Sequence, residues 1–205
     1  MRKEYVGDDE MIERDIVRST EVMYCHHICR KDAYDAKRFK IANSQGGYLA
    51  EYLSYDALDD EKNRLARTYI VRSKATDEMI AYFSLRSGFV SANEKGLFWN
   101  KGFDTVPGVE ISNFAINGEF RKNHPESRGV GDYIFHTLII PLIEVVSKLV
   151  GTSVIYIFAL PRERLVKHYE EVFGFSRLSK MQEMSMHKRI RPRYDKGCIF
   201  MYRKI

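Results

Sequence analysis

The chain has 205 residues, of which 44% are apolar and 13% aromatic, and its formal net charge is +5. This composition excludes an intrinsically disordered or collagen-like chain, and the length suits a single domain with its own core. With only three cysteines the chain is not a disulfide scaffold. No segment has the pattern of a signal peptide or a run of about 20 apolar residues, so we expect a reduced, cytoplasmic protein without a membrane anchor.

The N-terminal part, residues 1–66, is predicted to be mainly helical. Apolar residues recur at near-helical spacing between charged ones from Ile12 to Cys29. Residues 44–47 (SQGG) interrupt the pattern, and a short helix is expected over residues 48–55. Acidic residues placed before basic ones favour its continuation to Arg67, because that order suits the helix dipole.

A cluster of metal-ligand residue types, Cys25-His26-His27 followed by Cys29, raises the question of a zinc site. On a helix the two cysteines would share a face, and the histidines would point elsewhere. Because no second ligand pair has the spacing that would complete a tetrahedron, we expect no metal.

From residue 68 the pattern becomes that of a sheet. Residues 68–73 and 79–85 are rich in β-branched and aromatic residues and flank a polar stretch, which predicts a β-hairpin. Residues 109–117 are a further strand, whose alternation of polar and apolar residues slips near Asn113, as at a β-bulge. Residues 153–160 are continuously apolar, which predicts a strand covered on both faces.

A long apolar helix is expected over residues 132–150, with Pro141 distorting it because proline cannot donate a helix hydrogen bond. It connects strand 109–117 to strand 153–160. These elements make a β-α-β unit, whose strands should be parallel with a right-handed crossover.

The C-terminal part is predicted to hold one more helix and a hairpin. Pro161 and Arg162 open a helix that reaches about Val172 and is ended by Gly174. Strands are expected over residues 176–186 and 197–203. They enclose the basic segment 187–196 (HKRIRPRYDK), which is either a solvated hairpin tip or a contact for an anionic partner.

The turn before the long helix carries the most informative chemistry. Residues 126–131 read ESRGVG, and glycines there let the backbone approach a ligand closely. A helix start also presents unpaired N–H groups, so the turn suits a phosphate, with Arg128 as an added donor. It lacks the Lys-Ser or Lys-Thr of a P-loop, and Ile134 replaces the third glycine of a dinucleotide-binding turn. A plain helix start and the turn of an acyl-CoA transferase stay open.

The order of these features resembles the GNAT superfamily of N-acetyltransferases over residues 68–205. The features are strand 109–117, the turn Arg128-Gly129-Val130-Gly131, strand 153–160, Tyr169 and Gly174-Phe175. Glu126 stands where the family has Gln or Arg. The resemblance implies an α/β (α+β) fold with a mixed, twisted sheet flanked by helices, forming one domain over residues 1–205. It also implies acetyl-CoA as the acyl donor and no metal.

By this resemblance the chain would transfer acetyl directly to an amine, without a covalent enzyme intermediate. Tyr169 would protonate the leaving thiolate, and Glu110 would deprotonate the amine itself or through a water. Ser112 and Asn113 could also place that water, and His124 and His168 are other candidate proton carriers. An N–H at the bulge would stabilise the oxyanion. The residues implied at the pantetheine and acetyl group are Ala115, Ile116 and Asn117, and those at the pyrophosphate are Ser127, Arg128, Gly129, Val130, Gly131 and Asp132.

The acceptor stays open. The basic segment 187–196 suits an acidic or nucleic-acid partner, and the toxin branch of the family acts on aminoacyl-tRNA; a protein N-terminus, a lysine or a polyamine fits as well. The 91–108 loop, which contains Trp99, and the N-terminal helices would lie on the acceptor side. Two other classes also match: a non-catalytic protein that keeps the CoA fold and a basic nucleic-acid-binding protein. Exposed strand edges leave a homodimer open.

Overall fold

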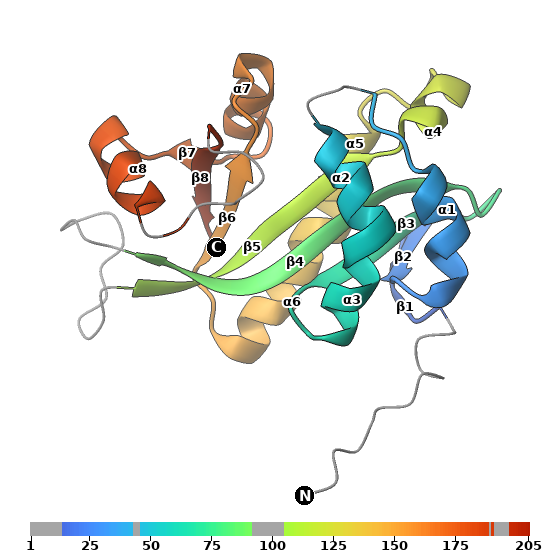
Figure 1. The fold of residues 1–205 in the computed structure, drawn as a ribbon, viewed down its shortest axis with the longest axis horizontal. Coiled ribbons are helices and arrows are strands. Elements are labelled where there is room, and N and C mark those ends of the chain that lie inside the picture. The colour runs from blue at the N-terminus through green and yellow to red at the C-terminus, as the bar shows by residue number, and fades with distance from the viewer. Residues whose placement is uncertain (1–13, 43–45, 92–104, 189, 191–196) are drawn as a thin grey trace, which may run out of the picture. The chain divides into compact units, whose positions relative to one another are not determined.

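The computed structural model describes residues 14–42, 46–91, 105–188, 190 and 197–205 (Figure 1). Its strands are β1 (Ile16–Ser19), β2 (Met23–His27), β3 (Arg67–Ser73), β4 (Met79–Ser91), β5 (Thr105–Ile116), β6 (Val154–Ala159), β7 (Ser176–Arg177) and β8 (Ile199–Lys204). Hydrogen bonding orders these strands β1-β2-β3-β4-β5-β6-β8-β7. β5 and β6 run parallel, whereas β1/β2, β2/β3, β6/β8 and β7/β8 are antiparallel. The predicted mixed sheet is therefore confirmed, including the parallel pair of the β-α-β unit.

The chain divides into two compact units, and the division cuts through β4 and β5. The first unit contains Met1–Ser84 and Asn113–Arg128, and the second contains Leu85–Ser112 and Gly129–Ile205. Each of these two strands therefore contributes residues to both cores.

In the first unit, helices cover one face of the strands (Figure 1). The helices are α1 (Ala33–Arg38), α2 (Gly47–Glu51), a π-helical turn (Tyr52–Asp56), α3 (Ala57–Lys62) and α4 (Gly118–Asn123). Leu53 and Ala57 pack in one core cluster with Ile70 of β3 and Tyr82 of β4. The helix predicted from residue 48 and the hairpin of β3 and β4 are both confirmed.

The prediction of helix around residues 16–29 is wrong, because β1 and β2 form a hairpin there. Thr20 closes its turn by donating its N–H to Met23 O at 2.8 Å. β2 then pairs with β3 from Met23 opposite Ser73 to His27 opposite Tyr69. The apolar residues match a helical spacing by chance, and the hydrogen bonds available along β3 outweigh this weak local preference.

The second unit contains the long helix, which begins slightly earlier than predicted. Its helices are α5 (Val130–Ile134), a π-helical turn (Phe135–Ile139), α6 (Ile140–Val150), α7 (Glu163–Glu171) and α8 (Lys180–His187). The first three are continuous, and the π turn ends two residues before Pro141. The expected distortion is thus a local widening of the helix, which accommodates the missing N–H of proline.

By length and composition alone, the 21-residue helix Val130–Val150 could cross a membrane. Buried core helices of soluble proteins pass the same test. Here Ile134, Leu138 and Ile143 are fully buried, and the Phe135 ring stacks on Phe173 at a centroid distance of 3.8 Å. This helix therefore uses its apolar face for packing within the unit.

The strand predicted over residues 176–186 is wrong beyond Arg177, because α8 follows it. Ser179 begins this helix with a capping box: its Oγ accepts from Gln182 N at 3.4 Å, and Gln182 Oε1 accepts from Ser179 N at 3.0 Å. The residues after it are mostly helix formers such as Lys, Met, Gln and Glu. The basic segment thus follows a helix, and its residues 189 and 191–196 lie outside the described residues.

Candidate active site

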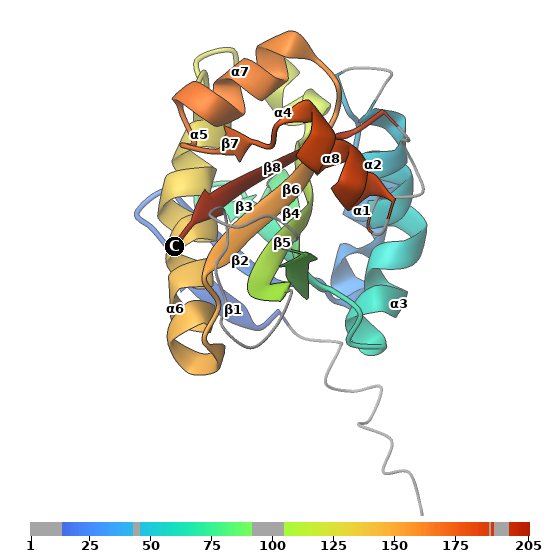
Figure 2. The same ribbon diagram turned by 90° about the vertical axis from the view of Figure 1, so that its left-hand side faces the viewer.

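The parallel ladder between β5 and β6 is short. It runs from Gly108 opposite Val154 to Glu110 opposite Tyr156. β6 continues to Ala159 and pairs with β8 along its whole length, as Figure 2 shows. Within the described residues, the last part of β6 therefore has ladder partners only on β8. This interrupted pairing is the geometry that a thioester arm entering between the two strands requires.

The burial of β5 alternates without the slip that was expected near Asn113. Val109, Ile111, Asn113 and Ala115 are buried, and the residues between them are half-buried. Asn113 is only 8% exposed, so a polar residue occupies a core position where an apolar one was expected. The slip in the sequence pattern reflects this buried amide and not a change of face.

Asn117 ends β5 and begins α4, a short helix where a loop was expected. Its side-chain oxygen accepts from Glu119 N at 3.1 Å, and its side-chain amide donates to Met79 O at 3.0 Å. Its backbone N–H donates to Ile80 O at 2.8 Å. Asn117 is thus anchored within the first unit, and the backbone contacts of Ala115, Ile116 and Asn117 with the pantetheine stay a prediction.

The glycine turn has the conformation that a helix-terminal anion site needs. Gly129 is the N-cap with φ 80°, in the left-handed region that glycine tolerates best. The first helical bond runs from Tyr133 N to Gly129 O at 3.0 Å. The amides of Val130, Gly131 and Asp132 precede that bond, so they have no acceptor within the helix. They are suitably placed to donate to a phosphate, which stays a prediction for these residues.

The residues just before the turn are tied to His124. Ser127 donates both its N–H, at 3.0 Å, and its hydroxyl, at 2.7 Å, to His124 O. The His124 ring lies 3.2 Å from a Glu126 oxygen and 3.0 Å from a Glu78 oxygen. Ser127 is therefore engaged in holding the turn, whereas Arg128 is exposed. The acid at position 126, unusual for the resembled family, has a histidine beside it.

Replacing His124 with glutamine is expected to destabilise the fold at mildly acidic pH and to matter less at alkaline pH. The hydrogen bond to Glu78, aided by Glu126, raises the pKa of His124 above its ordinary value. A raised pKa in the folded state stabilises below the unfolded value of about 6.5, and this stabilisation is lost as pH rises through the folded pKa. Urea unfolding of the wild type and His124→Gln at about pH 5.5 and pH 8.5 measures this pH-dependent difference in stability. A wild-type-minus-variant difference that stays constant across this range would contradict it.

Helix α7 places a tyrosine and a histidine side by side in the sequence. The half-buried Tyr169 ring packs edge-on against Phe173 at 5.3 Å and Phe175 at 5.5 Å. His168 Nε2 lies 2.7 Å from a carboxylate oxygen of Asp132, in the third position of the long helix. This contact brings α7 to the glycine turn within the second unit and gives the Asp132 carboxylate an imidazole partner.

Glu110 lies at the last parallel pair of β5 and β6 and is half-buried. The Tyr156 hydroxyl donates to its carboxylate at 3.4 Å. Burial raises the pKa of Glu110, against the opposing effects of the Arg86 charge and the Tyr156 hydrogen bond. A carboxylate with a raised pKa is a better proton acceptor, as a general base needs to be.

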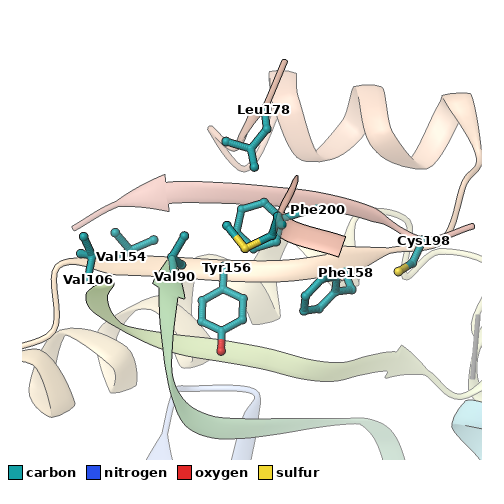
Figure 3. Close-up of a cluster of buried hydrophobic side chains, with 9 residues drawn as sticks. Val90, Val106, Val154, Tyr156, Phe158, Leu178, Cys198 and Phe200 are labelled. Carbon is teal, nitrogen blue, oxygen red and sulfur yellow. The ribbon is translucent and has the colours of Figure 1, made fainter. Parts of the chain in front are cut away.

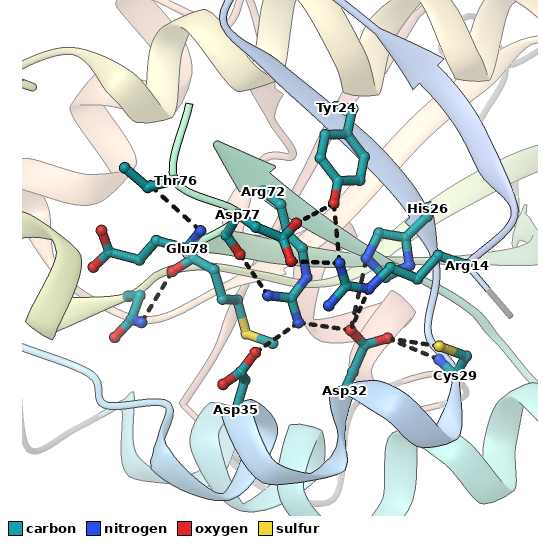
Figure 4. Close-up of polar contacts among 12 residues, drawn as sticks. Arg14, Tyr24, His26, Cys29, Asp32, Asp35, Arg72, Thr76, Asp77 and Glu78 are labelled. Carbon is teal, nitrogen blue, oxygen red and sulfur yellow. Dashed lines mark hydrogen bonds and ion pairs between the residues drawn. The ribbon is translucent and has the colours of Figure 1, made fainter. Parts of the chain in front are cut away.

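A second polar cluster, in the first unit, contains the residues that suggested zinc (Figure 4). Nitrogen, sulfur and oxygen ligand atoms of His26, Cys29 and Asp32 lie within 4.8 Å of one another. However, Arg72 donates to Asp32 at 2.7 Å, and Arg14 lies 3.8 Å from the same carboxylate. Two guanidinium groups already compensate this acid, so the electrostatics favour a structural ionic network over a cation site.

A basic surface that the sequence pattern does not indicate lies around the end of α1 and the last turn of α4. Gly118 N donates to Lys40 O at 2.7 Å, which holds the two segments together. The exposed Arg38 donates to the Tyr34 hydroxyl at 3.0 Å and lies 5.3 Å from its ring centre. The basic residues of this surface, all exposed, are Lys37, Arg38, Lys40, Arg121 and Lys122. Because they come from distant segments, no local charge run reveals them.

Most of the acceptor-side elements that the sequence predicted cannot be compared with this surface. Residues 92–104, including Trp99, and most of the segment 187–196 lie outside the described residues. The N-terminal elements of the predicted acceptor side are described, and they include the α1 part of the basic surface.

Solved structures match nearly the whole chain. A structure titled bacterial toxin matches with a TM-score of 0.67 and 12% identity over 89% of this chain and 90% of that one. A tyrosine-to-phenylalanine mutant of KacT matches at 0.63 and 17% over 90% and 95%. AtaTR bound with acetyl-CoA matches at 0.60 and 16% over 90% and 94%. The similarity is thus one of fold, across the full length of each protein.

Other matches are complexes of the same proteins. AtaT complexed with acetyl-methionyl-tRNAfMet has a TM-score of 0.58 and 17% identity over 87% of this chain and 93% of that one. Further titles describe an AtaT tyrosine-to-phenylalanine mutant bound to the antitoxin AtaR and acetyl-CoA, and a KacTA–DNA complex. No protein-family model and no curated protein sequence matches the chain. The fold expected from the resemblance to the GNAT superfamily is confirmed by these structural matches.

Proposed function

We propose that the chain is an N-acetyltransferase that moves the acetyl group of acetyl-CoA directly to an amine. The observation that carries this proposal is the short β5–β6 ladder, whose two strands are connected by a helix whose first amides have no helical acceptor. The first feature suits entry of a pantetheine arm, and the second suits a pyrophosphate. Acetyl-CoA, bound by a protein of the same fold, contains both groups.

The roles of the residues follow from their chemistry. The amides of Val130, Gly131 and Asp132 hold the pyrophosphate, and the His168 ring holds the Asp132 carboxylate through its 2.7 Å contact. Glu110 removes a proton from the attacking amine, since only the neutral amine has a lone pair available. Tyr169 donates a proton to the thiolate of CoA as it leaves. Together these groups provide binding, base and acid for transfer in one step.

The acceptor that we propose is the amino group of an aminoacyl-tRNA. The first support is the fold match to AtaT complexed with acetyl-methionyl-tRNAfMet. The second is the basic surface of α1 and α4, where exposed Tyr34, 69% accessible, offers a stacking face next to Arg38. Clustered positive charge with an aromatic ring suits a phosphate backbone and an unstacked base. The three cysteines are buried and none of them forms a disulfide, and we propose a reduced, cytoplasmic setting.

A label-transfer assay with acetyl-CoA tests the acceptor. We expect labelled acetyl on aminoacyl-tRNA and none on deacylated tRNA, because only the former has the free α-amine. The rate should fall steeply with added salt, because binding to a phosphate backbone releases counterions. If label appeared on a polyamine or a peptide but not on aminoacyl-tRNA, the proposed acceptor would be wrong, whereas the proposed acetyltransferase activity would stand. If no amine class led to release of CoA, the proposal that the chain is an acetyltransferase would be overturned.

Cofactor binding is tested separately with Gly131→Val. Acetyl-CoA should raise the melting temperature of the wild type, because a ligand that binds only the folded state stabilises it. The variant should lose this rise, since the valine side chain occupies space that a phosphate needs. Gly47→Val is the matched control, because an added Cβ there meets nothing within 4 Å. An equal rise in Gly131→Val and Gly47→Val would contradict the phosphate site.

A further inference from the structure

Two glycines on neighbouring strands make room for one buried tyrosine. A Cβ added at Gly88 of β4 would lie 1.9 Å from the Tyr156 hydroxyl oxygen. A Cβ added at Gly108 of β5 would lie 2.9 Å from Val154 O and 3.2 Å from the Tyr156 ring. Any larger residue at position 88 would displace the hydroxyl. The two glycines therefore form a notch that fits the Tyr156 side chain.

The ring of Tyr156 is held by packing, whereas its hydroxyl is aimed at a single acid. Tyr156 is 3% exposed and belongs to a core cluster with Phe158 and Phe200. Figure 3 shows it projecting from β6 toward the ribbons of β4 and β5. Its hydroxyl donates to Glu110 at 3.4 Å, and catalytic hydrogen bonds are often this long before substrate binds. A tyrosine that served packing alone would not need a notch at its polar end.

We propose that Tyr156 is a positioning residue, which holds the Glu110 carboxylate in the orientation for accepting the proton of the amine. The notch formed by Gly88 and Gly108 keeps its hydroxyl in place. This inference rests on the proposed function, because it assigns Glu110 the role of base. It adds a residue and a pair of glycines whose role is exerted through Glu110.

Among the described residues, one charged and one titratable group act on Glu110. Arg86 of β4 and Tyr156 of β6 are the groups whose charge or hydrogen bond acts on it. Both favour its ionised form, against the burial that raises its pKa. Loss of the Tyr156 hydroxyl should therefore raise the pKa of Glu110 further and leave its carboxylate free to rotate.

The contact between Tyr156 and Glu110 is tested by an NMR titration of the side-chain carboxyl carbons in glutamate-labelled protein, without acetyl-CoA or acceptor. The Glu110 signal is assigned as the one missing from Glu110→Gln. In Tyr156→Phe we expect this signal to titrate at higher pH than in the wild type. Tyr82→Phe, which removes another buried tyrosine hydroxyl, is the control and should leave it unchanged. Identical titration in the wild type and Tyr156→Phe would overturn the proposal.

Turnover then tests whether the positioning matters for the reaction. Tyr156→Phe should lower kcat about tenfold, a fraction of what a complete general base contributes. The acidic limb of its pH–rate profile should move to higher pH, while the KM for acetyl-CoA stays the same. A shifted titration with unchanged kcat would overturn the positioning role. Because the titration needs no turnover, an inactive wild type would count against the proposed function and not against the Tyr156–Glu110 contact.

The notch is tested by combining Gly88→Ala with Tyr156→Phe. Alanine at position 88 collides with the hydroxyl oxygen, so Gly88→Ala alone should reproduce the altered Glu110 titration and lower the melting temperature. In the Tyr156→Phe background the same alanine should cost less stability, because the closest atom is gone. If Gly88→Ala lowers stability equally in the wild type and in Tyr156→Phe, Gly88 is not needed to accommodate the Tyr156 hydroxyl.

Discussion

Replacing Tyr169 with phenylalanine is expected to lower kcat about a hundredfold, at the low end of what a general acid contributes. The expectation follows from the role of its hydroxyl, because the CoA thiolate must gain a proton as it leaves. The ring contacts with Phe173 and Phe175 do not use the hydroxyl, so phenylalanine preserves them. Acetyl-CoA affinity and melting temperature should therefore stay near the wild-type values, and only turnover should fall.

The neighbouring His168 is an alternative candidate for the general acid. His168 is the next residue on α7 and is paired with Asp132, which orients its ring. His168→Gln should weaken acetyl-CoA binding, because it removes the imidazole that holds the Asp132 carboxylate at the glycine turn. Tyr202→Phe, which alters a half-buried tyrosine of β8, is the control for loss of a hydroxyl. If turnover follows His168→Gln and is unchanged in Tyr169→Phe, the acid has been assigned to the wrong residue.

The part of the fold that could be predicted from the sequence is the part where local pattern and long-range order agree. Strand 109–117, the glycine turn and strand 153–160 follow one another with short connections, so a parallel crossover unit is nearly the only arrangement available. Gly129 and Gly174 both have positive φ, at a helix start and a helix end respectively. At these points the residue type dictates the backbone, and the prediction needs no tertiary information.

The sequence prediction failed at the N-terminal hairpin and at α8, for opposite reasons. β2 is a strand because β3 offers it a full set of hydrogen bonds, and this information lies more than forty residues further along the chain. In α8 the local signal was present but was overlooked: Ser179 and Gln182 form a capping box. The basic surface also depends on tertiary structure, since the segment after α1 and the start of α4 are joined only in the fold, by the bond from Gly118 N to Lys40 O.

A buried ionic network ties that N-terminal hairpin to α1 and β3 (Figure 4). Arg72 is 1% exposed and donates to Asp32 at 2.7 Å, to Asp35 at 2.8 Å and to the carbonyl of Asp77 at 2.7 Å. Asp32 is fully buried and also accepts from the backbone N–H of Cys29 at 2.9 Å. Each charge in this network is compensated only while its partner is present, which makes the network intolerant of single changes.

Replacing Arg72 with methionine is therefore expected to lower the free energy of unfolding by about 3–5 kcal/mol, the usual cost of leaving a buried charge without its partner. Methionine keeps most of the volume, so the loss reports charge and hydrogen bonding more than a cavity. Arg121→Met, at an exposed position of α4, is the matched control and should change stability by less than about 0.5 kcal/mol. Urea unfolding measures both.

The cause of the stability loss in Arg72→Met can be tested by also removing the Asp32 charge, which that variant leaves without its main partner. Asp32→Asn in the Arg72→Met background should recover part of the stability, because a neutral amide is less costly to bury than a carboxylate. Recovery is expected to be incomplete, since Asp35 also loses a partner and Arg14 loses the carboxylate at 3.8 Å. If the double variant loses the sum of the two single costs, the residues act independently. The network would then be a set of separate contacts, and the N-terminal hairpin would owe its place to its pairing with β3 alone.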